Sequence, residues 1–161
     1  MLLYLLRHGD AVDSATLHDS ERPLTERGSE QSRTAAAFFQ RSKISFGLII
    51  TSPLLRAKQM AQPAKELLAV KQTFESEYLV PGSNPNQLFD LLSNQSADSI
   101  LLVGHEPHLS TTISLLICGD TSAQIEMKKA SCACVEIAKP IEAGKGNLKW
   151  LITSEHMKTL R

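Results

Sequence analysis

Two histidines and two arginines each stand shortly after a short apolar run of the sequence. They are Arg7, His8, Arg56 and His105. Near neutral pH an imidazole can act as a nucleophile or as a hydrogen-bond donor, and a guanidinium matches the oxygen geometry of phosphate. Gathering such cationic groups at one place is unfavourable unless an anion joins them. The set therefore predicts an anion site, with phosphate as its natural guest.

Taken singly, each of these residues has an ordinary explanation. A histidine after a strand is usually a solvated loop residue, and an arginine in a first helical turn is usually a solvated charge that the helix dipole slightly disfavours. Gly9 and Gly104, beside the two histidines, can be simple turn residues. The functional interpretation therefore requires the four side chains to meet at one edge of a sheet.

The elements that would bring them together alternate along the chain. Apolar or alternating runs predict strands over residues 2–6, 48–51, 73–80, 100–103, 131–138 and 148–153. Helical patterns predict helices over residues 25–41, 53–69, 86–93 and 107–118. Pro53 and Pro107 stand where a first helical turn would begin, and Ser52 would be the N-cap of the earlier helix.

This alternation is typical of an α/β fold with three layers, a mainly parallel sheet with helices on both faces. The last two strands would pair across the turn at residues 144–147, so at least one strand must run antiparallel. In open sheets of this kind, ligands bind outside the carboxyl ends of the strands. Arg7, His8 and His105 follow such ends, and Arg56 would lie about one turn into the helix that starts at the same edge.

Length and composition limit the alternatives. A chain of 161 residues suits a single domain spanning residues 1–161, and 42% apolar residues suffice for a core. With 17 basic and 17 acidic side chains the formal charge is zero, which provides no general attraction to nucleic acid or to an anionic membrane. The first apolar run is too short for a signal peptide or a membrane span. Three cysteines do not make a disulfide framework, so we expect a soluble, reduced, cytoplasmic protein.

The motifs at the strand ends resemble those of a known family. Arg7-His8-Gly9 is similar to the signature of the histidine phosphatase superfamily, which includes the phosphoglycerate mutases. Residues 52–57, Ser-Pro-Leu-Leu-Arg-Ala, and Gly104-His105 match its later motifs in the same order, and residues 22–28 look like the segment that opens its first helix. The short chain and the run from Arg7 to Ala11 most resemble its small phosphohistidine phosphatase branch, the SixA-like proteins. The resemblance extends from residue 2 to about residue 118 and continues more weakly to the end.

The resemblance implies a mechanism through a phosphohistidine intermediate. His8 would be the nucleophile, and Arg7, Arg56 and His105 would hold the phosphoryl oxygens. Arg22 would add a further contact to the substrate, although a solvated loop arginine is an equal alternative. Water would then release inorganic phosphate, with no metal or cofactor.

Many relatives use an acidic residue to protonate an alkoxide leaving group. Glu75, Glu77 and Glu106 are the candidates here, but exposed structural carboxylates are the simpler interpretation of all three. Without an acid, the enzyme would prefer an easy leaving group such as a phosphorylated imidazole. We therefore expect a phosphatase that acts on a phosphohistidine of a signalling or phosphotransfer protein, and that works as a monomer. The alternative within the superfamily is a small-molecule phosphomonoesterase.

Two other classes of function stay open at this point. His105, Glu106 and His108, joined by residues 8–10, could hold a metal ion, although Pro107 interrupts a helical ligand pair. The other class is a non-enzymatic module that binds phosphoproteins, with the pocket retained and catalytic turnover lost. Cys132 and Cys134 alternate in an apolar run and predict a buried pair on one strand face rather than metal ligands.

Overall fold

The computed structural model describes residues 1–160 and contains one six-stranded sheet in the order β3-β2-β4-β1-β5-β6. Its strands are β1 (Leu2–Arg7), β2 (Leu48–Thr51), β3 (Thr73–Glu75), β4 (Ser99–Gly104), β5 (Cys132–Glu136) and β6 (Asn147–Ile152). The first four strands are parallel to one another, whereas β5 is antiparallel to both β1 and β6. The predicted mainly parallel sheet with an antiparallel strand is confirmed.

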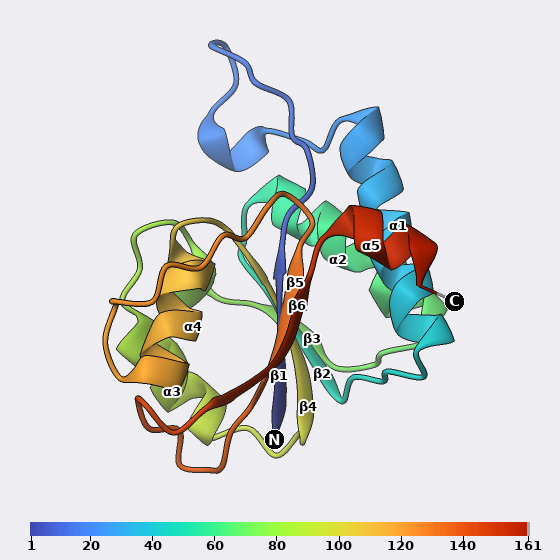
Figure 1. Cartoon of the computed structure of the whole chain (residues 1–161). Helices are drawn as coiled ribbons and strands as arrows, with labels where there is room; N and C mark the ends of the chain where they lie inside the picture. The colour runs from blue at the N-terminus through green and yellow to red at the C-terminus, as the bar shows by residue number, and fades with distance from the viewer. Residues whose placement is uncertain (161) are drawn as a thin grey trace.

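Helices cover both faces of this sheet (Figure 1). They are α1 (Glu26–Arg41), α2 (Leu55–Leu67), α3 (Pro85–Ser93), α4 (His108–Cys118) and α5 (Ser154–Thr159), with short 3-10 helices η1 (Asp19–Glu21) and η2 (Glu77–Leu79). The first two helices and α5 pack together on one face, and α3 and α4 pack together on the other. None of these helices is long and apolar enough to cross a membrane.

The alternation of side chains along the central strands builds a separate core on each face. In β1, Tyr4 and Leu6 belong to the cluster under α1 and α2, whereas Leu3 and Leu5 belong to the cluster under α3 and α4. All four are at most 6% exposed. Strands that are buried on both faces appear in the sequence as unbroken apolar runs, which is why β1 and β4 could be predicted from those runs.

Three local predictions were wrong at their ends. Helix α2 begins at Leu55 rather than at Pro53, because Ser52 accepts a hydrogen bond from the backbone N–H of Leu54 and closes a turn there. The strand predicted over residues 73–80 ends at Glu75, and η2 follows it. Thr153, predicted as the end of the last strand, instead caps the unpredicted helix α5.

Helix α2, which carries Arg56, is held to α1 by a hydrogen bond that a proline in α2 makes possible. Pro63 lies inside α2 and has no N–H, so the carbonyl of Gln59 lacks its helical donor. The Ser32 hydroxyl of α1 donates to that carbonyl at 3.3 Å. The Gln59 side-chain oxygen also accepts from the backbone N–H of Leu24 at 2.7 Å. These contacts fix the start of α2 relative to the segment before α1.

Candidate active site

The carboxyl ends of β1, β4 and β2 lie side by side at one edge of the sheet. Arg7 pairs with Gly104 in the parallel register of β1 and β4, and the His8 backbone N–H continues the ladder by donating to the Gly104 carbonyl at 3.1 Å. The backbone N–H of Ser52, just past β2, donates to the Val103 carbonyl at 2.9 Å. This topology brings together residues that are far apart in the sequence.

The two predicted histidines face each other at this edge. The ring centroids of His8 and His105 are 5.0 Å apart. The Nδ1 atom of His8 is 2.7 Å from the Gly9 carbonyl oxygen, a contact that assigns the proton to Nδ1. The Nε2 atom of His8 therefore carries a lone pair, as a nucleophile requires.

The surroundings of His8 keep its imidazole unprotonated. Burial is the largest influence and lowers the pKa of His8 from 6.5 to about 4, against the opposing effect of the Gly9 carbonyl. The positive charges of Arg56, Arg7 and Lys129 lower this pKa further. Across the neutral pH range, His8 is thus in the protonation state from which it can attack phosphorus.

Several buried nitrogens at this edge have no protein partner. Both ring nitrogens of His105, which is 1% exposed, and the Nε of Arg7 lack a hydrogen bond within residues 1–160. Burial, followed by the charges of His8 and Arg56, lowers the pKa of His105 to about 3. Buried polar groups normally have partners. An oxyanion with several acceptor oxygens would accept from the Arg7 Nε and from the one ring N–H that a neutral His105 carries.

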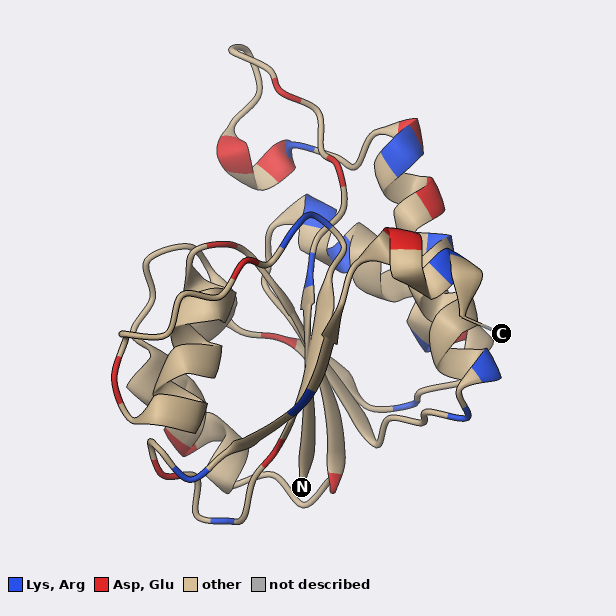
Figure 2. Cartoon of the chain, viewed as in Figure 1, with Lys and Arg blue, Asp and Glu red and all other residues tan. Residues whose placement is uncertain are grey.

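The arginines are held by the protein in different ways. Arg7 donates from Nη1 to the Met127 carbonyl at 2.6 Å, which leaves its Nε free within the described chain. Arg56 is 5% exposed and donates from Nη1 to the Asp19 carbonyl at 2.7 Å and from Nη2 to the Asp19 carboxylate at 3.1 Å. Figure 2 shows Lys and Arg segments gathered at this end of the sheet.

Arg22 reaches the cluster indirectly. Its Nε donates to the Val12 carbonyl at 2.7 Å, and its Nη1 donates to the Asp19 carboxylate at 3.0 Å. Asp19 thus bridges Arg22 and Arg56. Sequence reasoning missed Asp19, because a single acidic residue in a polar loop carries no periodic or motif signal.

The three candidate acids lie in different places. Glu75 ends β3 and pairs with Lys58 at 3.4 Å, in a groove beside the sheet rather than among the histidines. Glu77 lies exposed in η2. Glu106 is next to His105 and lines an open groove together with Arg7, but its carboxylate accepts a hydrogen bond from the backbone N–H of Ser110 at 3.0 Å.

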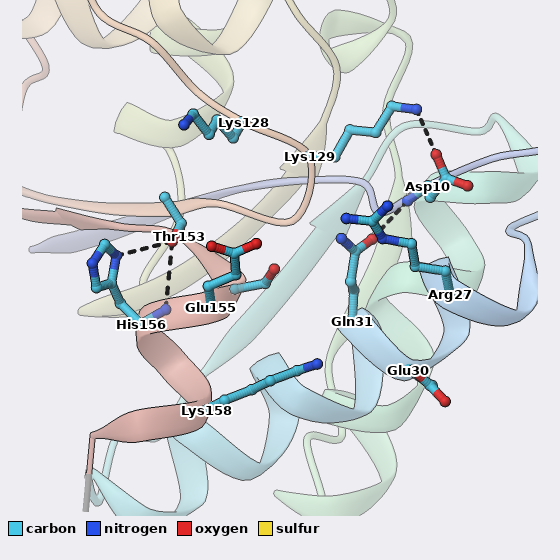
Figure 3. A pocket seen from close by; sticks show the side chains of 11 residues that line it. Asp10, Arg27, Glu30, Gln31, Lys128, Lys129, Thr153, Glu155, His156 and Lys158 are labelled. Atoms are coloured by element: carbon cyan, nitrogen blue, oxygen red, sulfur yellow. Dashed lines mark hydrogen bonds and ion pairs between the residues drawn. The ribbon is translucent and has the colours of Figure 1, made fainter.

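A pocket of about 420 Å³ lies beside the loop that carries His8, between α1 and α5 (Figure 3). Gln31 of α1 accepts a hydrogen bond from the backbone N–H of Asp10 at 2.8 Å, and Lys129 pairs with the Asp10 carboxylate at 2.6 Å. Thr25, the N-cap of α1, donates to the same carboxylate at 2.9 Å. These contacts immobilise the loop directly after His8. As for a metal, residues 1–160 contain no group of three or more suitably placed ligand side chains.

The buried histidines predict a pH-dependent stability. Below their ordinary pKa of 6.5 the unfolded chain takes up protons that His8 and His105 in the folded protein do not accept until about pH 4 and pH 3. The free energy of unfolding should be highest above pH 6.5, and His8 and His105 together should lower it by about 2 kcal/mol between pH 6.5 and about 5.5. Burial also lowers the pKa of His108, which adds to the fall. Urea denaturation across this range measures it. The variant His105→Gln should lose about 1 kcal/mol of the fall, and a flat profile in the wild type would contradict the assignment.

The comparisons with known proteins agree with this geometry. Residues 3–77 match the model of the histidine phosphatase superfamily, branch 1. An uncharacterized protein of Picosynechococcus is 34% identical, with 96% of each chain covered. The phosphohistidine phosphatase SixA of Escherichia coli is 26% identical, with 98% of this chain and 97% of that protein covered.

Solved structures show the same fold. The protein histidine phosphatase SixA in complex with tungstate superimposes with a TM-score of 0.86 at 25% identity, covering 98% of this chain and 99% of that one. The alpha-ribazole phosphatase from Shigella flexneri shares the fold with a TM-score of 0.79 at 19% identity, over 96% and 97% of the two chains. The chain therefore belongs to the histidine phosphatase superfamily, and within it resembles the SixA-like branch.

Proposed function

We propose that this phosphatase removes phosphate from a phosphohistidine on a signalling or phosphotransfer protein. The observation that carries the proposal is the pairing at the sheet edge: a neutral His8 with a free Nε2 lies 5.0 Å, ring to ring, from His105, whose buried nitrogens lack protein partners in the described chain. The relative SixA is named a phosphohistidine phosphatase, which supports the substrate. The proposed form of the enzyme is a cytoplasmic monomer.

In the first step, Nε2 of His8 attacks phosphorus and the bond from phosphorus to the nitrogen of the substrate imidazole breaks. The leaving imidazole accepts a proton from solvent. The guanidinium groups of Arg7 and Arg56 and a ring N–H of His105 stabilise the three phosphoryl oxygens during the transfer. In the second step, water attacks the phosphorus on His8, inorganic phosphate leaves, and the neutral imidazole is restored.

The surroundings of the candidate acids favour an easy leaving group. Glu75 is paired with Lys58, and Glu106 accepts a backbone hydrogen bond. Burial raises the pKa of Asp19, but the hydrogen bonds from Arg56 and Arg22 outweigh it and hold this pKa below the usual range. Glu75 and Glu106 are thus engaged with other groups of the protein, and the lowered pKa of Asp19 disfavours a proton on its carboxylate. An alkoxide needs such a proton far more than an imidazole does.

A substrate panel tests the proposal. We expect kcat/KM for a phosphotransfer domain phosphorylated on its histidine to exceed that for phosphoserine and for sugar phosphates by at least about tenfold, since these esters need a proton donor. Release of inorganic phosphate measures all the reactions. A preference for the phosphoesters would instead support the small-molecule phosphomonoesterase, a class whose fold the alpha-ribazole phosphatase shares.

A further inference from the structure

An arm of residues 12–22 projects from the body of the protein beside the candidate site (Figure 1, top). Its base is closed by the bridge between Ala11 and Leu24, and by a hydrogen bond from the backbone N–H of Val12 to the Pro23 carbonyl at 2.9 Å. The helix η1 lies in the returning half of the arm and begins with Asp19. Asp19 therefore lies in the returning half of a loop whose two ends are tied together, and not on a free segment.

Asp19 is the residue through which the arm meets the catalytic cluster. Its carbonyl and one carboxylate oxygen accept from both terminal nitrogens of Arg56, and the other carboxylate oxygen accepts from Arg22. Arg56 is almost fully buried, so its charge has to be compensated by a neighbour. Asp19 supplies that compensation.

The carboxylate of Asp19 also acts on the pocket where phosphate would bind. Among the charges that influence His105, Asp19 is the negative one, and it favours the protonated ring against the positive charges of Arg56 and His8. The Asp19 carboxylate lies 3.1 Å from Nη2 of Arg56, so a negative charge stands directly beside one of the two arginines that would bind phosphate. Figure 2 shows further acidic segments in this arm.

We propose that Asp19 determines which leaving groups the site accepts, by placing a fixed negative charge beside the arginines that bind phosphate. A substrate that carries a second anion next to its phosphate would be repelled by this carboxylate. A substrate with a neutral or protonated leaving group, such as an imidazole, would not. The inference rests on the proposed function, because it assumes that phosphate binds between His8, His105 and the arginines.

The expected selectivity follows from the strength of one repulsive charge pair. At an open site wetted by solvent, where the effective dielectric constant is about 40, one such pair about 6–8 Å apart changes a rate ratio by about five- to tenfold. Specificity of this kind arises from a repulsive element as much as from an attractive one.

The test uses two aryl substrates that differ by one carboxylate, phenyl phosphate and 4-carboxyphenyl phosphate. We expect the wild type to prefer phenyl phosphate in kcat/KM by about five- to tenfold, and Asp19→Asn to reduce this ratio to below about twofold. Asparagine keeps the shape and the acceptor oxygen, so the arm can still bind Arg56. Because both substrates meet the same variant, a general loss of efficiency cancels in the ratio.

Asp13→Asn is the matched control. It removes the same charge from the same arm, but the Asp13 carboxylate is fully exposed and lies 3.9 Å from Arg22. The ratio of kcat/KM for phenyl phosphate to that for 4-carboxyphenyl phosphate should be the same in Asp13→Asn as in the wild type. A ratio in Asp19→Asn equal to the wild-type ratio, even with lower rates for both substrates, would show that Asp19 only supports the arm and would overturn the proposal.

Two further readouts separate the possible failures. If Asp19→Asn does not fold, the substrate ratio of the wild type can be measured as salt is raised from about 0.05 to 0.5 M. The ratio should shrink, because salt screens a charge effect at an open site. A constant ratio would overturn the proposal. The aryl pair needs no phosphohistidine. A failed preference for phosphohistidine together with a ratio that responds to Asp19→Asn would overturn the proposed substrate and leave the charge effect in place.

Discussion

Replacing His8 with alanine is expected to lower kcat/KM for every phosphoryl substrate by at least about 10³-fold, because the covalent route disappears with its nucleophile. Arg7, Arg56 and His105, which the proposal assigns to the phosphoryl oxygens, stay in place in this variant. Substrate affinity should therefore change much less than turnover. Release of phosphate under steady-state conditions, with binding of inorganic phosphate measured by calorimetry, distinguishes the two effects.

The same variant tests the intermediate directly. Rapid quench of the wild type with a radiolabelled phosphodonor should give labelled protein whose label is stable in base and labile in acid, as a phosphoramidate is. His8→Ala should carry no such label. His156→Ala, which removes an exposed histidine of α5, should label like the wild type. Label retained on His8→Ala would place the nucleophile on another residue.

The residues that could be predicted from the sequence are those positioned by backbone topology. His8 and His105 directly follow strands that are buried on both faces, and parallel strands bring their carboxyl ends to one edge whatever the side chains in between. Arg56 follows because α2 starts at that edge. The predicted strands and helices around these residues were correct within a few positions for the same reason.

The contacts that tune the site could not be predicted. The hydrogen bond from Arg7 to the Met127 carbonyl joins residues 120 positions apart, and the pairing of Asp19 with Arg56 joins two elements with no shared pattern. Helix α5 has six residues, too few for local propensity to indicate a helix. It is stabilised by packing, since Met157 is 0% exposed and lies in the core under α1.

Gly28 shows why tertiary contacts override a local rule. In the sequence this glycine is a weak point in the helix over residues 25–41, and helix propensity alone predicts that Gly28→Ala would stabilise α1 by about 1 kcal/mol. In the structure an added Cβ at this position would lie 2.0 Å from the Asp10 carbonyl oxygen. The start of α1 therefore rests directly on the backbone of the loop that follows His8.

We expect Gly28→Ala to lower the free energy of unfolding by about 2–3 kcal/mol, because backbone atoms on both sides of the contact must move apart. The displaced loop carries the Gly9 carbonyl that orients His8, and a shift of about 1 Å in such a group costs about 10²-fold in kcat/KM. Urea denaturation and phosphate release measure the two losses.

Gly82→Ala is the matched control. The φ of 83° at Gly82 makes this substitution cost about 1 kcal/mol of stability, but no atom lies within 4 Å of an added Cβ, so activity should be unchanged. If Gly28→Ala were instead as stable and active as the wild type, the loop after His8 would have to be held by Gln31, Thr25 and Lys129 alone. Close packing of α1 against this loop would then not be what positions His8.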